Sequence, residues 1–161
     1  MMDLELVAEI LKPHEAKLCQ LPYAAWSRLE AIRPHLPVNG YLRDDRTLMY
    51  SYMHDVAIEQ FSACPDVELL SNSQNFRLRI ERSIIVRLNH GKPMGGYANN
   101  PTQLSMAFDS QASVPGVRDG VNLRLLYHTD EFNAEITRVS LVCPDGPDTI
   151  AWEYDLSLIH I

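Results

Sequence analysis

The chain has 161 residues, of which 46% are hydrophobic and 22% are charged, and its net charge is −7. This composition excludes a disordered chain, because it supplies enough apolar surface for one core. It also excludes a membrane-spanning protein, because no apolar run approaches the roughly 20 residues that cross a bilayer.

The first 40 residues predict a helical segment. Asp3 is a typical N-cap for a first helix, whose apolar residues at positions 4, 7, 8 and 11 share one face. A second short helix is predicted over residues 14–20 and a third over residues 23–32. Pro34 ends the third helix and opens a loop. We therefore treat residues 1–40 as an N-terminal helical segment.

Residues 41–155 predict an α+β core domain. Its longest helix is expected over residues 45–63, ending before Pro65. Apolar residues recur along this helix at helical spacing, as they do in helices that lie on a sheet. The residues of this stripe are Met49, Tyr52, Met53, Val56 and Ala57.

Strands dominate the rest of the core. Within residues 75–91, NFRLRIERSIIVRLNHG, apolar residues alternate with polar ones on both sides of a short polar break, which predicts a β-hairpin. Because the links between neighbouring strands are short, we expect an antiparallel sheet of about five strands with one long helix packed on a face. The other expected elements are strands over residues 67–70, 121–128, 135–143 and 149–155 and a short helix over residues 102–111, preceded by a loop over residues 91–101.

The final residues, 156–161, read LSLIHI. This hexapeptide resembles the translation of an adapter used in sequencing libraries. We expect an artefact at the truncated C-terminus of a metagenomic reading frame, and we leave these residues out of the fold prediction.

The predicted hairpin is the only strongly basic part of this acidic chain. Arg77 and Arg79 share one face of the first strand, and Arg82 and Arg87 extend the patch. Such a face can contact an acidic partner protein or the phosphates of a nucleic acid, or it can be a solvated face paired with the acidic strands. The net charge disfavours nucleic acid, because an acidic protein repels it at long range.

Three carboxylates near the hairpin offer an alternative. Asp66 and Glu68 precede it and Glu81 lies within it, as in nucleases that hold Mg²⁺ between a Pro-Asp pair and a Glu-x-Lys pair. Ser83 stands where such an enzyme has lysine. The alternative hypothesis is therefore a divergent metal-dependent nuclease.

No other catalytic or metal-binding set is evident. His54 and Glu59 are five residues apart and do not share a helix face, so they lack the spacing of a helical zinc site. Three widely separated cysteines, Cys19, Cys64 and Cys143, indicate free thiols in a reducing compartment. The acidic N-terminus lacks the positive charge of a secretory signal. We expect a cytoplasmic protein with no cofactor and no membrane contact.

Residues 45–155 carry a sequence of motifs that resembles a known group. After the hairpin come Asn100-Pro101-Thr102-Gln103, Phe108, Gln111 and Pro115-Gly116-Val117, and later Cys143-Pro144 and Trp152. This order resembles a group of small uncharacterised bacterial proteins associated with mobile-element genes. Their usual neighbour combines a helix-turn-helix with a metallopeptidase-like domain. The resemblance implies an accessory or regulatory role and no active-site residues.

These observations favour a non-enzymatic protein. We expect a protein-interaction or regulatory component, in the manner of a toxin–antitoxin-like two-gene module. Its contact residues are predicted to be Arg77, Arg79, Arg82 and Arg87.

Overall fold

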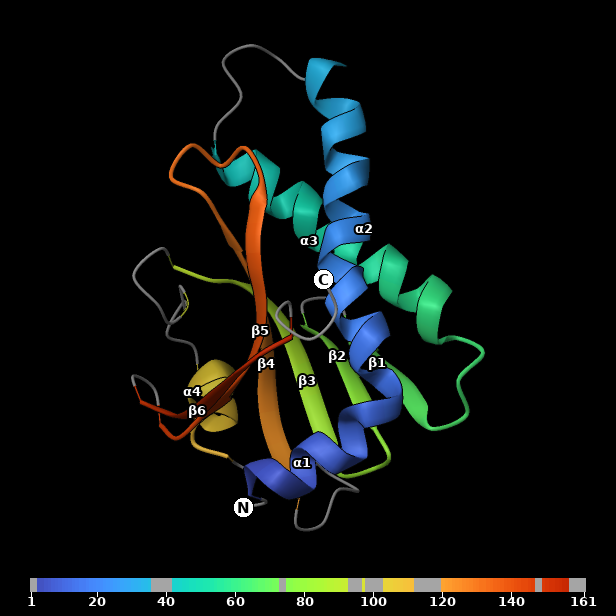
Figure 1. The fold of residues 1–161 in the computed structure, drawn as a ribbon, viewed down its shortest axis with the longest axis vertical. Helices are drawn as coiled ribbons and strands as arrows, with labels where there is room; N and C mark the ends of the chain where they lie inside the picture. The colour runs from blue at the N-terminus through green and yellow to red at the C-terminus, as the bar shows by residue number, and fades with distance from the viewer. Residues whose placement is uncertain are drawn as a thin grey trace.

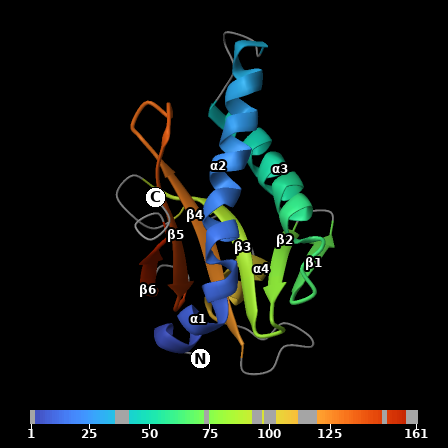
Figure 2. The ribbon, with the colours of Figure 1, turned by 45° about the vertical axis from the view of Figure 1, so that its right-hand side comes forward.

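A computed structural model shows three layers (Figure 1). Helices α1, α2 and α3 cover one face of a six-stranded sheet, and the short helix α4 lies on the opposite face (Figure 2). This arrangement is α+β, as the sequence predicts. The structure describes residues 3–35, 42–72, 75–92, 97, 103–111, 120–146 and 149–156.

The N-terminal helices begin as predicted and then differ from the prediction. Helix α1 (Leu4–Leu11) starts at Asp3, whose carboxylate accepts a hydrogen bond from the backbone N–H of Leu6 at 2.9 Å. After a 3₁₀ turn (Lys12–His14), helix α2 runs unbroken over Glu15–Ile32. The prediction of two separate helices over residues 14–20 and 23–32 is therefore wrong. Pro22 is buried inside α2, and the apolar residues on both sides of it pack into one core, which offsets the hydrogen bond that proline cannot donate.

Helix α3 (Leu42–Phe61) is the predicted long helix. It packs against α2 on the sheet (Figure 1). Four residues of the predicted stripe are buried, and Tyr52 is half-buried against the same core. The four are Met49, Met53, Val56 and Ala57.

All predicted strands form, and their order in the sheet follows the order in the chain. The prediction of an antiparallel sheet of about five strands is nevertheless confirmed only in part. The sheet has six strands, and β3 and β4 are parallel. Their connection is long and contains α4 (Gln103–Asp109), as parallel neighbours require, because the chain must return to the same end of the sheet. The strands are β1 (Val67–Asn72), β2 (Asn75–Ile80), β3 (Ile84–His90), β4 (Val121–Thr129), β5 (Ile136–Pro144) and β6 (Ile150–Asp155).

The two faces of the sheet differ in chemistry. Leu78 on β2 lies beside Val86 on β3, which lies beside Leu123 on β4, and all three are fully buried under the helices. The residues between them point to the other face, because side chains alternate along a strand. That second face carries Arg77, Arg79, Arg87 and Arg124.

The helices and the sheet share one core. Val7 of α1, Leu18 of α2 and Leu141 of β5 belong to the same buried cluster. Leu156, the first residue of the suspected artefact, is also buried in this core, whereas residues 157–161 lie outside the described part. Most of the predicted loop over residues 91–101 lies outside it too. In the described ranges no helix is both long and apolar enough to cross a membrane.

Candidate functional site

Three of the four predicted contact arginines lie on the second face, and the fourth, Arg82, lies in the β2–β3 turn beside it. Arg77 on β2 and Arg87 on β3 stand directly opposite each other in the antiparallel register. Arg79 forms an ion pair with Glu68 on β1. Arg82 is exposed in the β2–β3 turn, where its φ is +62°. We call these four residues the arginine face.

The arginine face carries more positive charge than its described surroundings neutralise. Neither Arg77 nor Arg87 makes an ion pair within the described residues, and the buried Nε atoms of Arg77 and Arg79 have no hydrogen-bond partner there. Burial lowers the pKa of Arg87, and Arg124 lowers it further, against smaller opposing effects that include Asp109. The positive charge of Arg87 is therefore disfavoured where it stands, and an anion beside it would relieve this cost.

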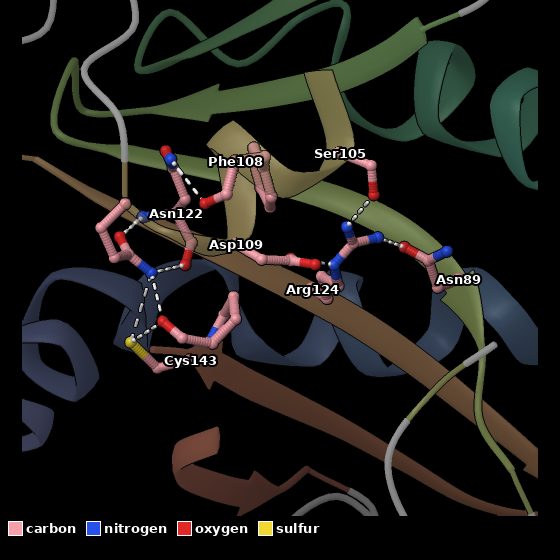
Figure 3. A network of polar contacts seen from close by, with 9 residues as sticks. Asn89, Ser105, Phe108, Asp109, Asn122, Arg124 and Cys143 are labelled. Atoms are coloured by element: carbon pink, nitrogen blue, oxygen red, sulfur yellow. Dashed lines mark hydrogen bonds and ion pairs between the residues drawn. The ribbon is translucent and has the colours of Figure 1, made fainter. Parts of the chain in front are cut away.

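Arg124, on the same face, has a different environment (Figure 3). Its side chain is 1% exposed and lies under α4. Its Nε donates to Asp109 Oδ1 at 2.8 Å, and its two terminal nitrogens donate to Asn89 Oδ1 at 2.6 Å and Ser105 Oγ at 3.2 Å. Every nitrogen of this guanidinium has a partner, so Arg124 fastens α4 to the sheet.

Two aromatic rings border this network. The Arg124 guanidinium lies 4.4 Å from the centre of the Tyr97 ring and 5.2 Å from that of Phe108. Arg87 approaches Phe108 at the same 5.2 Å. Burial raises the pKa of Tyr97 to about 12, so its phenol is protonated. The Phe108 ring thus contacts two cations, Arg87 of the arginine face and Arg124 of the network.

Gln111 completes the attachment of α4. Its side-chain amide donates to the backbone carbonyls of Asn122 at 2.9 Å and Pro144 at 2.7 Å, and its carbonyl accepts from the Asn122 N–H at 2.7 Å. The Asn122 side chain in turn donates to the carbonyl of Phe108 at 3.1 Å (Figure 3). These contacts satisfy backbone groups at the end of α4 and at the ends of β4 and β5, so their role is structural.

The sequence analysis did not find the Arg124 network. A signal was present: Arg124 interrupts the apolar run of β4, VNLRLLYHT, a strand buried over nearly its whole length. A charged residue in such a strand is almost always paired. The identity of the partner, Asp109, depends on how α4 packs on the sheet and is not readable from spacing.

The three carboxylates of the nuclease alternative are brought only partly together. Asp66, Glu68 and Glu81 line one hollow with Pro65 and Arg82. Oxygens of Asp66 and Glu81 lie within 4.8 Å of each other and of a ring nitrogen of His14. Glu68 is outside this group of three and is paired with Arg79. The structure therefore places a histidine, which the sequence analysis did not consider, where the nuclease alternative needs a third carboxylate.

A buried cluster at β4, β5 and β6 lacks the geometry of a catalytic triad. His128 Nε2 lies 3.3 Å from Ser140 Oγ, but the Ser140 hydroxyl donates to Glu153 Oε1 at 2.8 Å. Arg138 approaches the same His128 nitrogen at 3.2 Å. Ser140 is fully buried, so this hydroxyl is engaged with a carboxylate and closed to solvent.

The cysteines are free thiols, as predicted. Burial raises the pKa of Cys143 to about 11 and also raises that of Cys19. Both thiols therefore remain protonated, which is the unreactive form.

Comparison with known proteins does not assign this chain to a family. No protein-family model, no curated protein and no solved structure matches this chain.

Proposed function

We propose that this protein is a non-enzymatic interaction component that binds an acidic segment of a partner protein at the arginine face. The observation that carries the proposal is the pair Arg77 and Arg87, two like charges opposite each other without an ion-pair partner in the described ranges. Like charges at directly opposite strand positions are destabilising. A bound carboxylate would turn this cost into a favourable contact.

The geometry suits carboxylates. A guanidinium presents a planar fork of donors that matches a carboxylate, often through two parallel hydrogen bonds. The unpartnered Nε atoms of Arg77 and Arg79 are donors for such contacts. Arg82 is exposed in the turn beside this patch and adds a positive charge that is open to solvent. An acidic peptide strand or loop fits this row, and the products of neighbouring genes are the first partners to examine.

The affinity of an acidic peptide for paired variants tests the proposal. We would measure binding of a fluorescent peptide rich in Asp and Glu to the wild type and to the double variant R77S/R87S. Removing the opposed pair is expected to weaken binding by roughly tenfold or more, because each charge-assisted hydrogen bond contributes about 1.5–3 kcal/mol. Substituting all four arginines by Ser is expected to abolish binding while the fold remains intact.

The matched control is R28S/R46S, which removes two positive charges from the helices, the exposed Arg46 and the partly exposed Arg28 that pairs with Glu59. It is expected to change the affinity by less than about twofold, because exposed charges contribute little. Equal losses in both double variants would contradict a specific site. Capture from host lysate with and without nuclease treatment distinguishes partner classes: a partner lost on nuclease treatment would be nucleic acid, with an affinity that falls steeply with salt.

A further inference from the structure

A second site lies where the helices meet the edge of the sheet. His14 closes the 3₁₀ turn before α2, Asp66 follows α3, and Glu81 is in the β2–β3 turn. One ligand atom from each, a ring nitrogen and two carboxylate oxygens, lie within 4.8 Å of one another. Three segments that are far apart in the chain thus present metal-binding atoms to one point.

The backbone holds the two carboxylates in register. The N–H of Glu81 donates to the carbonyl of Asp66 at 2.8 Å, one step beyond the Val67–Ile80 pair that ends the β1–β2 ladder. The two residues are therefore opposite each other at the end of the ladder, and the exposed side chains are free to turn toward a shared ligand.

The environment of the His14 side chain indicates a bound ligand. The residue is only 6% exposed, and its Nε2 is buried with no hydrogen-bond partner. A buried polar nitrogen without a partner costs about 1–3 kcal/mol, and such groups are rare in native structures. Metal coordination satisfies an imidazole nitrogen as a hydrogen bond does.

From these contacts we propose that His14, Asp66 and Glu81 bind a first-row divalent transition metal ion of the Zn²⁺ class. A neutral imidazole suits such ions, whereas Mg²⁺ and Ca²⁺ prefer ligand sets made only of oxygen. Ligand atoms at about 2.1 Å from one zinc ion are at most roughly 4.2 Å apart, so coordination requires only small rotations of the exposed carboxylates. Three protein ligands leave a fourth position for water.

The bound ion would tie the helical layer to the sheet edge. It would join the start of α2, the α3–β1 link and the β2–β3 turn, and it would offset the repulsion between Asp66 and Glu81. Glu68 and Arg82 line the same hollow, but Glu68 is held by Arg79 and is not one of the three ligands. The metal proposal does not rest on the proposed binding of an acidic partner, although Arg82 belongs both to this hollow and to the arginine face.

Calorimetric titration of the full chain with Zn²⁺ tests the site. The wild type is expected to bind one Zn²⁺ per chain, with a higher Tm in its presence. D66N and E81Q are each expected to weaken binding by about 100-fold or more, because even the outer partners of metal ligands contribute roughly 10- to 100-fold. Both substitutions fall on exposed residues, so the fold is retained. Co²⁺ provides a second readout, a visible absorption band in the wild type that D66N/E81Q lacks.

E68Q is the matched control, because it neutralises a carboxylate of the same hollow outside the three ligands. It is expected to keep the affinity for Zn²⁺ within a few-fold. A wild type that binds no Zn²⁺ would overturn the proposal, and so would D66N/E81Q binding Zn²⁺ as the wild type does, which would place the ion elsewhere. Tighter binding of Mg²⁺ than of Zn²⁺ would contradict the role of His14.

Discussion

Two arginine-bearing regions lie on the same face of the sheet, and their surroundings differ. Under α4, Arg124 meets a carboxylate, an amide, a hydroxyl and two aromatic rings. In the arginine face, Arg77 and Arg87 stand opposite each other in the β2–β3 register, and Arg87 also contacts the Phe108 ring. The Arg124 region is complete within the described residues, whereas the arginine face has donors without acceptors.

The comparison shows that residue type and strand position do not define the role of an arginine. Arg87 and Arg124 are direct neighbours in the β3–β4 register, so they occupy corresponding positions on adjacent strands. The difference is the helix that covers them. Asp109 on α4 forms the ion pair with Arg124 at 2.8 Å and only a weaker, longer-range interaction with Arg87. We infer that Arg124 stabilises the fold and that Arg87 is available for a partner.

We expect the largest effect, a loss of stability, from a substitution that breaks the Arg124 network. D109N keeps the shape of the side chain but leaves the Arg124 charge buried without a counter-charge. Loss of one partner of a buried ion pair costs about 3–5 kcal/mol, so the free energy of unfolding in urea is expected to fall by that amount. E59Q, which breaks the exposed pair with Arg28, is the control and is expected to cost less than about 1 kcal/mol. Equal losses would mean that the Arg124 network contributes no more than a surface pair.

A pH titration sharpens the comparison at His90, a half-buried side chain at the end of β3 whose charged neighbours are positive. Burial, together with smaller effects of Arg46 and His128, lowers the pKa of His90 to about 4 from its ordinary 6.5. As the pH falls, His90 therefore binds a proton near pH 6.5 in the unfolded chain but only near pH 4 in the folded chain. Stability is full above pH 6.5 and is lost as the pH falls toward 4, by at most roughly 3 kcal/mol.

The variant H90Q tests this assignment. Unfolding in urea between pH 7 and pH 4.5 is expected to show a shallower loss of stability in H90Q than in the wild type. Some loss will remain, because burial also lowers the pKa of His128. Identical slopes for the two proteins would show that His90 does not contribute.

The smallest effect is expected at the arginine face. R77S removes one of two opposed charges and an unpartnered buried donor, so its unfolding free energy is expected to change by less than about 0.5 kcal/mol or to rise slightly. The same variant is expected to bind the acidic peptide more weakly. A loss of stability as large as that of D109N would place Arg77 among the structural residues.

The sequence by itself determined the local elements. The alternation in NFRLRIERSIIVRLNHG predicts both strands of the hairpin and the face that each side chain occupies. The stripe along α3 and the Asp3 cap of α1 are equally local, because a helix or strand repeats over a few residues and leaves a period in the sequence. Among the candidate sites, the sequence analysis named the four residues of the arginine face and two of the three proposed metal ligands, Asp66 and Glu81.

Only the tertiary structure decided which distant segments meet. The parallel pairing of β3 and β4, the unbroken passage of α2 through Pro22, and the pairing of Arg124 with Asp109 all depend on packing between elements. His14 reaches Asp66 and Glu81 only because α2 lies against the core that the sheet builds. The physical reason is that such contacts join residues with no fixed spacing along the chain, so no period in the sequence records them.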